Sequence, residues 1–244
     1  GTGVMAADML AELVRLGQMP ARYLILEVSA ELRERQRRML QERVPSLLPR
    51  IHWLESLPAS LSGVIVANEV LDAMPASRFR RTVGGFEEIT VSVEAGKFAW
   101  STRPAAAELC AALRLLEGTL PAPLTAGHIA EICLGLPPFF RSLGDVLARG
   151  AVLVMDYGHT RAAYYHPQRH MGTLMCHYRQ RAHDNPFLWV GLQDITTHVD
   201  FTAVAEAATA AGFTLAGYTT QAHFLLALGL AEQATDWRDR KSVV

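Results

Sequence analysis

The sequence has little cysteine, no long hydrophobic run and no excess of either charge. Only Cys110, Cys133 and Cys176 occur, and no two of them form a Cys-x-x-Cys pair. This pattern argues against a disulfide framework and against a cysteine-rich zinc site, and it favours a reducing compartment. The apolar run at residues 150–155 is far shorter than the ~18 residues that a membrane-spanning helix requires. We therefore expect no membrane span.

The balance of charges excludes a general affinity for nucleic acid. Lys and Arg together number 23 and Asp and Glu number 24, which gives a formal net charge of -1. Non-specific binding to a phosphate backbone needs a cationic excess, so we do not expect nucleic acid as a partner. With 244 residues, half of them hydrophobic, the chain is long enough for one large domain or two small ones.

Helical and strand patterns alternate along most of the chain. Apolar spacing predicts helices over residues 6–16, 30–44, 129–147 and 199–211, and strands over residues 23–28, 51–53, 63–67, 151–155, 213–218 and 223–228. Such alternation predicts an α/β fold with a doubly wound, Rossmann-like and mostly parallel sheet. The short last connection predicts that the final strand is antiparallel.

Two stretches interrupt this alternation. Residues 78–100 alternate around Gly84-Gly85, which predicts a β-hairpin insertion. Residues 158–197 hold five of the nine histidines without regular periodicity and predict a loop insertion. Inserted segments at strand ends usually carry substrate contacts.

The two ends of the chain differ from a complete domain of this kind. A glycine turn such as Gly1-Thr2-Gly3 normally follows an apolar strand, and none precedes it here, so we expect the first strand to be missing. Residues 231–244 are mostly polar after residue 236 and are interpreted as a tail.

A nucleoside site is indicated near the start of the chain. Gly1 and Gly3 precede a predicted helix, where a ligand can approach the backbone, and Glu27 ends the next strand, where a carboxylate can accept hydrogen bonds from ribose hydroxyls. Trp53 and Glu55 follow the second strand, where they could stack on or bond an adenine. Because Gly1-x-Gly3-x-x-Ala6 also fits a dinucleotide fingerprint, NAD remains an alternative ligand.

A pair of carboxylates follows the strand at residues 63–67. In Asn68-Glu69-Val-Leu-Asp72-Ala-Met-Pro75 the two acids are three residues apart, so that on a helical turn they lie on one side. Such a pair can bind a guanidinium or accept a proton from an amine, although the segment could equally be a capped loop. Beside a nucleoside site, the pair suits methyl transfer to a positively charged nucleophile.

Other polar residues have two interpretations each. The histidines of residues 158–197 match no common zinc spacing, so we expect no metal. His198, with Asp194 and Asp200 nearby, could orient a guanidinium or shuttle a proton, but Asp200 could instead cap the following helix. Asp156 and Tyr157 end a strand and are expected to face the cleft.

Several segments, in order along the chain, resemble the MidA-like family of S-adenosyl-L-methionine (SAM)-dependent methyltransferases. They are residues 68–75, 156–158, 172–174 with 177–178, 191–201 and 221–226. The string Gln-Asp-Ile-Thr-Thr-His-Val-Asp-Phe at residues 193–201 is the most restrictive of them. The resemblance implies a class I methyltransferase fold and SAM as cofactor. The mitochondrial members of this family are respiratory complex I assembly factors that methylate an arginine of a complex I subunit.

The resemblance also implies roles for particular residues. Gly1 and Gly3 match the SAM loop, Glu27 matches the ribose acceptor, and Asn68 and Glu69 match the motif near the methyl group. We therefore predict the following sites in full: cofactor-binding Gly1, Gly3, Glu27, Glu55 and Asn68; catalytic Glu69, Asp72 and His198; substrate-binding Asp156, Tyr157, His177 and Asp194.

On this interpretation residues 1–75, 127–157 and 198–230 form a SAM-binding core, residues 76–126 a hairpin and helical insertion, and residues 158–197 a substrate-side insertion. The expected activity is methylation of an arginine side chain in a protein partner, in a bacterial cytoplasm or a mitochondrial matrix. A non-catalytic assembly factor that keeps the fold and an NAD-dependent oxidoreductase remain as alternatives.

Overall fold

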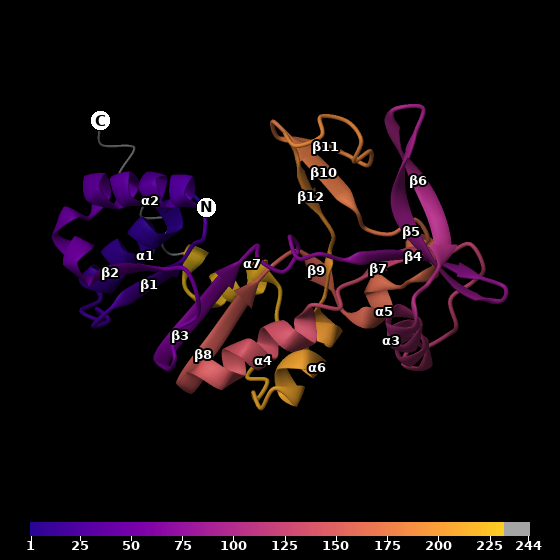
Figure 1. Ribbon diagram of the computed structural model, residues 1–244. Coiled ribbons are helices and arrows are strands. Elements are labelled where there is room, and N and C mark those ends of the chain that lie inside the picture. Colours follow the sequence, from indigo (N-terminus) through magenta and orange to yellow (C-terminus); the bar gives the residue numbers. More distant parts are fainter. Residues whose placement is uncertain (232–244) are drawn as a thin grey trace. The chain divides into compact units, whose positions relative to one another are not determined.

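The first sixty-one residues pack two helices against a pair of parallel strands. The computed structural model describes residues 1–231, which form two compact units, residues 1–61 and the residues from 62 onward. The first unit contains α1 (Val4–Arg15), β1 (Tyr23–Leu26), α2 (Ala30–Arg43), the 3-10 helix η1 (Pro45–Arg50) and β2 (Ile51–Leu54) (Figure 1). Its core consists of Ala7, Leu10, Leu40, Val44 and Ile51.

The predicted elements of this unit are confirmed, and local chemistry explains their ends. Ser29 caps α2, because its Oγ accepts a hydrogen bond from the Leu32 N–H at 3.3 Å. β1 and β2 pair in parallel with Tyr23 opposite Ile51. Their carboxyl ends therefore lie at the same edge, which is where Glu27 and Glu55 follow them.

The second unit contains a central strand pair, β3 (Leu61–Asn68) and β8 (Leu147–Met155). Gly150 lies against the Gly63 backbone near the start of both strands, and the Glu69 N–H donates to the Met155 carbonyl at 2.8 Å at their ends. The two strands therefore run in the same direction. Helices α4 (Leu136–Val146) and α6 (Phe201–Ala210) pack against each other near this pair (Figure 1).

A four-stranded antiparallel sheet forms the largest sheet of the second unit. Its order is β6-β5-β4-β7, made of β4 (Ser77–Thr82), β5 (Gly85–Glu94), β6 (Lys97–Pro104) and β7 (Ile129–Ile132), with helix α3 (Ala107–Gly118) after β6. The predicted hairpin at Gly84-Gly85 is confirmed, with Thr82 opposite Gly85. Phe79 of β4 and Ala130 of β7 are register partners and are both buried in one core with Leu113 of α3.

The prediction of one helix over residues 129–147 was therefore wrong in its first part. Residues 129–132 form strand β7, and the helix begins only at Leu136. The physical reason is the burial of Ala130 against Phe79, which rewards pairing with β4. Pro137 and Pro138 then stand in the first turn of α4, where a missing N–H costs nothing.

The remaining elements are short. They are β9 (Gly158–His159), α5 (Arg161–Tyr164), the 3-10 helix η2 (Pro167–Arg169), β10 (Met175–Tyr178), β11 (Arg181–His183), β12 (Asp194–Thr196), β13 (Val199–Asp200) and α7 (Gln221–Ala227). β11, β10 and β12 form an antiparallel sheet in that order, and β9 pairs with β13 in parallel. The segment predicted as an irregular insertion thus contains a small sheet of its own.

The fold is mixed α/β, but the prediction of a single, mostly parallel sheet is corrected. The strands of the described residues form five separate sheets, of which the four-stranded and the three-stranded ones are antiparallel. The predicted strands at residues 213–218 and 223–228 are also wrong, because residues 213–220 form no regular element and residues 221–227 form helix α7. Thr220 caps this helix by accepting from the His223 N–H, and a short apolar run fits either structure until such a cap decides.

Residues 232–244, most of the predicted tail, lie outside the described residues. In the part of the chain that the structure describes, no helix combines the length and the apolar character that crossing a membrane requires.

Candidate functional site

The glycine turn at the start of the chain leads directly into α1. Gly3 is the N-cap of this helix, with a left-handed φ of 91°, and its backbone carries no side-chain cap. A Cβ at this position would lie 3.1 Å from the Gln36 Cα, so the close approach and the positive φ both require glycine. The free helix N-terminus leaves backbone N–H groups able to face a ligand.

Glu27 stands beside this turn, at the end of β1. One carboxylate oxygen, Oε1, accepts from the Ser29 N–H at 2.9 Å, and Oε2 accepts from Gln36 Nε2 at 3.1 Å. The same Gln36 amide donates to the Gly1 carbonyl at 2.9 Å. The structure therefore brings together Gly1, Gly3 and Glu27, three of the five predicted cofactor residues, around one buried glutamine.

Trp53 and Glu55, at the end of β2, have partners within the protein. The Trp53 Nε1–H donates to Gln36 Oε1 at 2.9 Å, and the Arg37 guanidinium lies 5.1 Å from the centroid of the Trp53 ring. Glu55 forms an ion pair with Arg33 at 2.7 Å, although 73% of its side chain is exposed. Trp53 thus supports the Glu27 site by holding Gln36, whereas the Glu55 side chain remains exposed.

These residues fit a nucleoside. A glycine turn at an uncapped helix N-terminus provides backbone donors, and a half-buried carboxylate at the neighbouring strand end provides acceptors for hydroxyl groups.

The second unit holds the predicted carboxylate pair in a tight loop after β3. Asp156, at the end of β8, accepts three backbone N–H groups of this loop on its Oδ2: Val70 at 3.2 Å, Leu71 at 2.9 Å and Asp72 at 3.3 Å. Its Oδ1 accepts from the Tyr157 N–H at 2.8 Å. Asp156, predicted as a substrate contact, is thus placed as the anchor of the loop that carries Glu69 and Asp72.

Glu69 begins this loop in a strained conformation. Its φ of 50° is left-handed, which is uncommon for a residue other than glycine. The negative charge of Glu69 and a hydrogen bond with it raise the pKa of the exposed Tyr157 phenol. Glu69 and Tyr157 are therefore neighbours at the ends of β3 and β8.

Asp72 is buried, with 9% of its surface exposed. Its Oδ1 has no hydrogen-bond partner among the described residues. Burial, together with the charges of Asp156 and Glu69, raises the pKa of its carboxyl group. Its backbone carbonyl accepts from the Thr197 N–H at 3.1 Å, which joins the loop to the segment before His198.

His198, predicted as catalytic, lies just beyond this junction. Its backbone N–H donates to the Thr173 Oγ1 at 3.1 Å, and its ring centroid is 5.2 Å from that of His159. Burial and the neighbouring His159 and Arg169 lower the pKa of the imidazole, which favours its neutral form. Its Nδ1 is buried and unpaired within residues 1–231.

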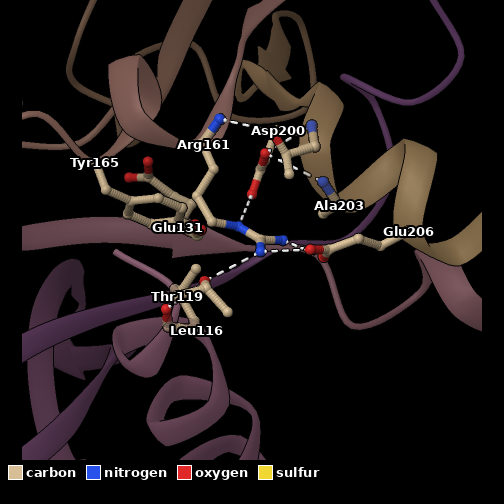
Figure 2. Close-up of polar contacts among 9 residues, drawn as sticks. Leu116, Thr119, Glu131, Arg161, Tyr165, Asp200, Ala203 and Glu206 are labelled. Carbon is tan, nitrogen blue, oxygen red and sulfur yellow. Dashed lines mark hydrogen bonds and ion pairs between the residues drawn. The ribbon is translucent and has the colours of Figure 1, made fainter. Parts of the chain in front are cut away.

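Asp200 has the capping role that the sequence left open. Its Oδ1 accepts from the Thr202 and Ala203 N–H groups at the start of α6, and its Oδ2 accepts from Arg161 Nε at 3.1 Å. Figure 2 shows the Arg161 guanidinium between Asp200, Glu206 and Thr119. This cluster and His198 line a largely apolar cavity of about 410 Å³.

His177 and Asp194 lie opposite each other as register partners of β10 and β12, in the small antiparallel sheet. Both are exposed. Asn68 is the last residue of β3. Among residues 1–231, no group of three or more His, Cys, Asp or Glu side chains is arranged to hold a metal ion.

Two buried residues were missed by sequence reasoning. Gln36 gave no signal, because a glutamine inside a charged helix is ordinary. Glu131 gave one, because it is a charge within the apolar run Ile-Ala-Glu-Ile at residues 129–132, and buried charges are kept only when they are paired. Its Oε2 accepts from the Thr173 N–H at 2.7 Å, and its Oε1 lies 3.3 Å from Arg78 Nε.

Comparison with known proteins gives one consistent result. Residues 1–219 match the model of a family described as "Putative S-adenosyl-L-methionine-dependent methyltransferase". A methyltransferase candidate from Burkholderia thailandensis, crystallised with S-adenosyl-homocysteine, is similar, with a TM-score of 0.89 and 44% identity over 97% of this chain and 60% of that one. A native crystal structure of an uncharacterised protein of the same superfamily and organism gives 0.88 and 44% over 97% and 62%.

A curated relative, the mitochondrial protein arginine methyltransferase NDUFAF7 of Danio rerio, is 29% identical over 190 residues, which are 73% of this chain and 40% of that protein. The chain thus spans less than two thirds of the length of each of these relatives. The family match, by contrast, covers most of this chain. The chain therefore belongs to this methyltransferase family.

Proposed function

We propose that this chain binds SAM in its first unit and methylates an arginine side chain of a protein through the loop at residues 69–72. The observation that carries the proposal is the Asp72 carboxyl group, whose buried Oδ1 has no partner among the described residues. Glu69 lies three residues away on the same anchored loop. Support for arginine also comes from the Danio rerio relative, which is named a protein arginine methyltransferase.

The cofactor residues follow from the geometry of the first unit. The Gly1–Gly3 turn would face the cofactor with backbone groups, and Glu27 would accept hydrogen bonds from the ribose hydroxyls. The family match and the S-adenosyl-homocysteine in the Burkholderia structure support SAM rather than NAD as this cofactor. When bound, SAM supplies an electrophilic methyl group.

The chain's own part in the reaction is to hold and orient the nucleophile. Glu69 would accept hydrogen bonds from the guanidinium, which aligns one terminal nitrogen and localises electron density on it. Methylation leaves that nitrogen with one proton too many. Asp72 is the acceptor for it, because its raised pKa makes Oδ1 a better base than an ordinary aspartate oxygen.

The experiment compares the chain with a Glu69→Gln variant. We expect transfer of tritium from methyl-labelled SAM to an arginine-containing peptide pool, recovered as methylarginine after hydrolysis. Glu69→Gln should lower turnover by about 100-fold or more, the usual range for a positioned acid or base, and change S-adenosyl-homocysteine affinity less than about twofold. The matched control is Glu108→Gln, on the exposed face of α3.

Three outcomes would contradict the proposal. Equal losses of turnover and of S-adenosyl-homocysteine affinity would reassign Glu69 to the cofactor. Tight S-adenosyl-homocysteine binding without any methyl transfer would favour the non-catalytic assembly factor, and a rise in melting temperature with NADH alone would favour the oxidoreductase.

A further inference from the structure

Gln36 is a buried amide at the centre of the first unit. It lies in α2, with 4% of its surface exposed. Its side chain takes part in three hydrogen bonds: Nε2 donates to the Gly1 carbonyl and to Glu27 Oε2, and Oε1 accepts from Trp53. Among the described contacts of this unit, Gln36 is therefore the only side chain that hydrogen-bonds both the glycine turn and the Glu27 carboxylate.

The orientation of the Gln36 amide is set by Trp53. An indole N–H can only donate, so the atom that meets it at 2.9 Å must be the amide oxygen. The NH₂ group must then point the other way, toward two acceptors, Glu27 and the Gly1 carbonyl. A flipped amide would place its oxygen against the Glu27 carboxylate, which is repulsive.

The hydrogen bonds of Glu27 leave it suited to a vicinal diol. A carboxylate accepts about four hydrogen bonds. Two of these positions are filled by protein donors, the Ser29 N–H on Oε1 and Gln36 on Oε2, so each oxygen is fixed by one donor and retains free acceptor capacity. The carboxylate is thereby held in one orientation before any ligand arrives.

Gln36 also sets the position of the glycine turn. Its Cα stands 3.1 Å from the point where a Gly3 Cβ would be, and its amide bonds the carbonyl of Gly1, two residues earlier. The turn and the carboxylate come from different elements, and this residue contacts both.

We propose that Gln36, oriented by Trp53, is a positioning residue that preorganises the Glu27 carboxylate and the Gly1–Gly3 turn for the ribose of the cofactor. The inference rests on the proposed function, since it concerns the same cofactor site. It adds the means by which this chain selects a ribose with both hydroxyls: the carboxylate is locked by an amide that cannot rotate.

The first test measures ligand discrimination by calorimetry. Gln36→Met keeps the length of the side chain and removes its hydrogen bonds, and Trp53→Phe removes the donor that orients the amide. We expect each variant to bind S-adenosyl-homocysteine about 10-fold more weakly, the effect of losing one hydrogen bond to a charged group. The same two substitutions should weaken binding of the 2′,3′-dideoxy analogue of S-adenosyl-homocysteine, which lacks both ribose hydroxyls, by less than about threefold.

The second test uses pH. Gln36→Glu retains an acceptor for Trp53. It replaces the amide nitrogen, which lies 3.1 Å from Glu27 Oε2, with a carboxyl oxygen. Two such groups share one proton, with a raised apparent pKa, and only the protonated pair restores a donor to Glu27. Affinity of Gln36→Glu for S-adenosyl-homocysteine should therefore recover by about 10-fold as pH falls from about 8 to about 5, beyond any change in the unaltered chain.

The matched controls are Gln41→Met and Gln41→Glu, because Gln41 lies exposed on the same helix. Both should bind like the unaltered chain at each pH. Equal weakening of S-adenosyl-homocysteine and of its dideoxy analogue in Gln36→Met and Trp53→Phe would overturn the positioning role and leave a structural one, as would a Gln36→Glu affinity that does not depend on pH.

The proposed function fails separately. If the unaltered chain binds neither S-adenosyl-homocysteine nor its analogue, the cofactor assignment itself falls. Should Gln36→Met not fold, judged by circular dichroism, Trp53→Phe and the pH dependence of Gln36→Glu decide the question.

Discussion

At residue 172 the backbone and a buried carboxylate together leave room for glycine alone. Gly172 has a φ of +81°, and an added Cβ would meet both carboxylate oxygens of Glu131. Glu131 cannot move away easily, because Thr173 and Arg78 hold it and only 1% of its side chain is exposed. Burial raises the pKa of this carboxyl group.

We expect Gly172→Ala to lower the free energy of unfolding by about 3 kcal/mol, the sum of a left-handed backbone and a disturbed buried ion pair. Urea denaturation measures it. Gly127→Ala is the matched control: its φ is +90°, but nothing lies within 4 Å of the added Cβ, so it should cost only about 1 kcal/mol. Equal costs would mean that Glu131 moves aside.

Buried polar side chains that are held by distant partners are also difficult to predict from the sequence. Glu69 and Asp72 could be singled out because they lie three residues apart directly after a strand, at the edge where such a sheet places its chemistry. Gln36 could not, because its importance arises from contacts with Gly1 and Trp53, which are 35 and 17 residues away. No local pattern records such contacts.

Among the elements, the loop after β3 depends on the end of β8. Asp156 supplies one oxygen to three backbone N–H groups of this loop, and a carboxylate is the only small side chain that accepts so many.

We expect Asp156→Ala to lower the free energy of unfolding by about 2–4 kcal/mol, because the three N–H groups lose their shared acceptor. Methyl transfer should fall to background, since Glu69 would no longer be held. Asp145→Ala, at an exposed position of α4, is the control for both measurements. An Asp156→Ala variant with normal turnover would return Asp156 to the role of an ordinary strand-end residue.

Prediction of elements succeeded where the apolar periodicity was clear, as in α1 and β1, or where a cap agreed with it, as with Ser29 in α2. It failed where partners far along the chain decided the outcome. β7 pairs with β4, about 50 residues earlier, and residues 129–132 alone fit a helix equally well. Likewise, the order of the strands along the chain did not predict the sheets, because β7 pairs with β4 and so belongs to the antiparallel sheet of β4, β5 and β6.

On the scale of the whole molecule, three histidines of the second unit make a contribution to the free energy of unfolding that decreases as the pH falls. Burial is the main cause that lowers the pKa of His128, His159 and His198 from 6.5. At these three side chains the unfolded chain therefore binds more protons than the folded one as the pH falls below 6.5. Their contribution to stability is complete above that pH and is lost as pH falls toward the lowered pKa values.

His128→Gln removes one of these groups, and His128 is the most buried of the three. We expect its free energy of unfolding to decline less than that of the unaltered chain between about pH 6.5 and pH 5, by up to about 1 kcal/mol. Urea denaturation at several pH values gives both curves. Parallel curves would show that His128 titrates alike in the folded and unfolded states.

The positions of the candidate residues at the ends of their elements were more predictable than the pairing of the strands around them. Glycine turns and strand-end acids are short motifs, whose chemistry is local, and each lies where its own element ends. What the sequence could not supply was the support behind them: Gln36 behind Glu27, and Asp156 beneath Glu69.

The engagement of Arg161 has a consequence for an enzyme that would modify arginine. Its Nε bonds Asp200, one terminal nitrogen bonds Thr119 and Glu206, and the other bonds Glu206 again (Figure 2). Both hydrogens of Nη1 have partners, so a methyl group on this nitrogen would displace Thr119 or Glu206 from the cluster at the start of α6. Under the proposed activity, these contacts would disfavour automethylation at Nη1 of Arg161, whereas arginines exposed on the surface would stay open to that side reaction.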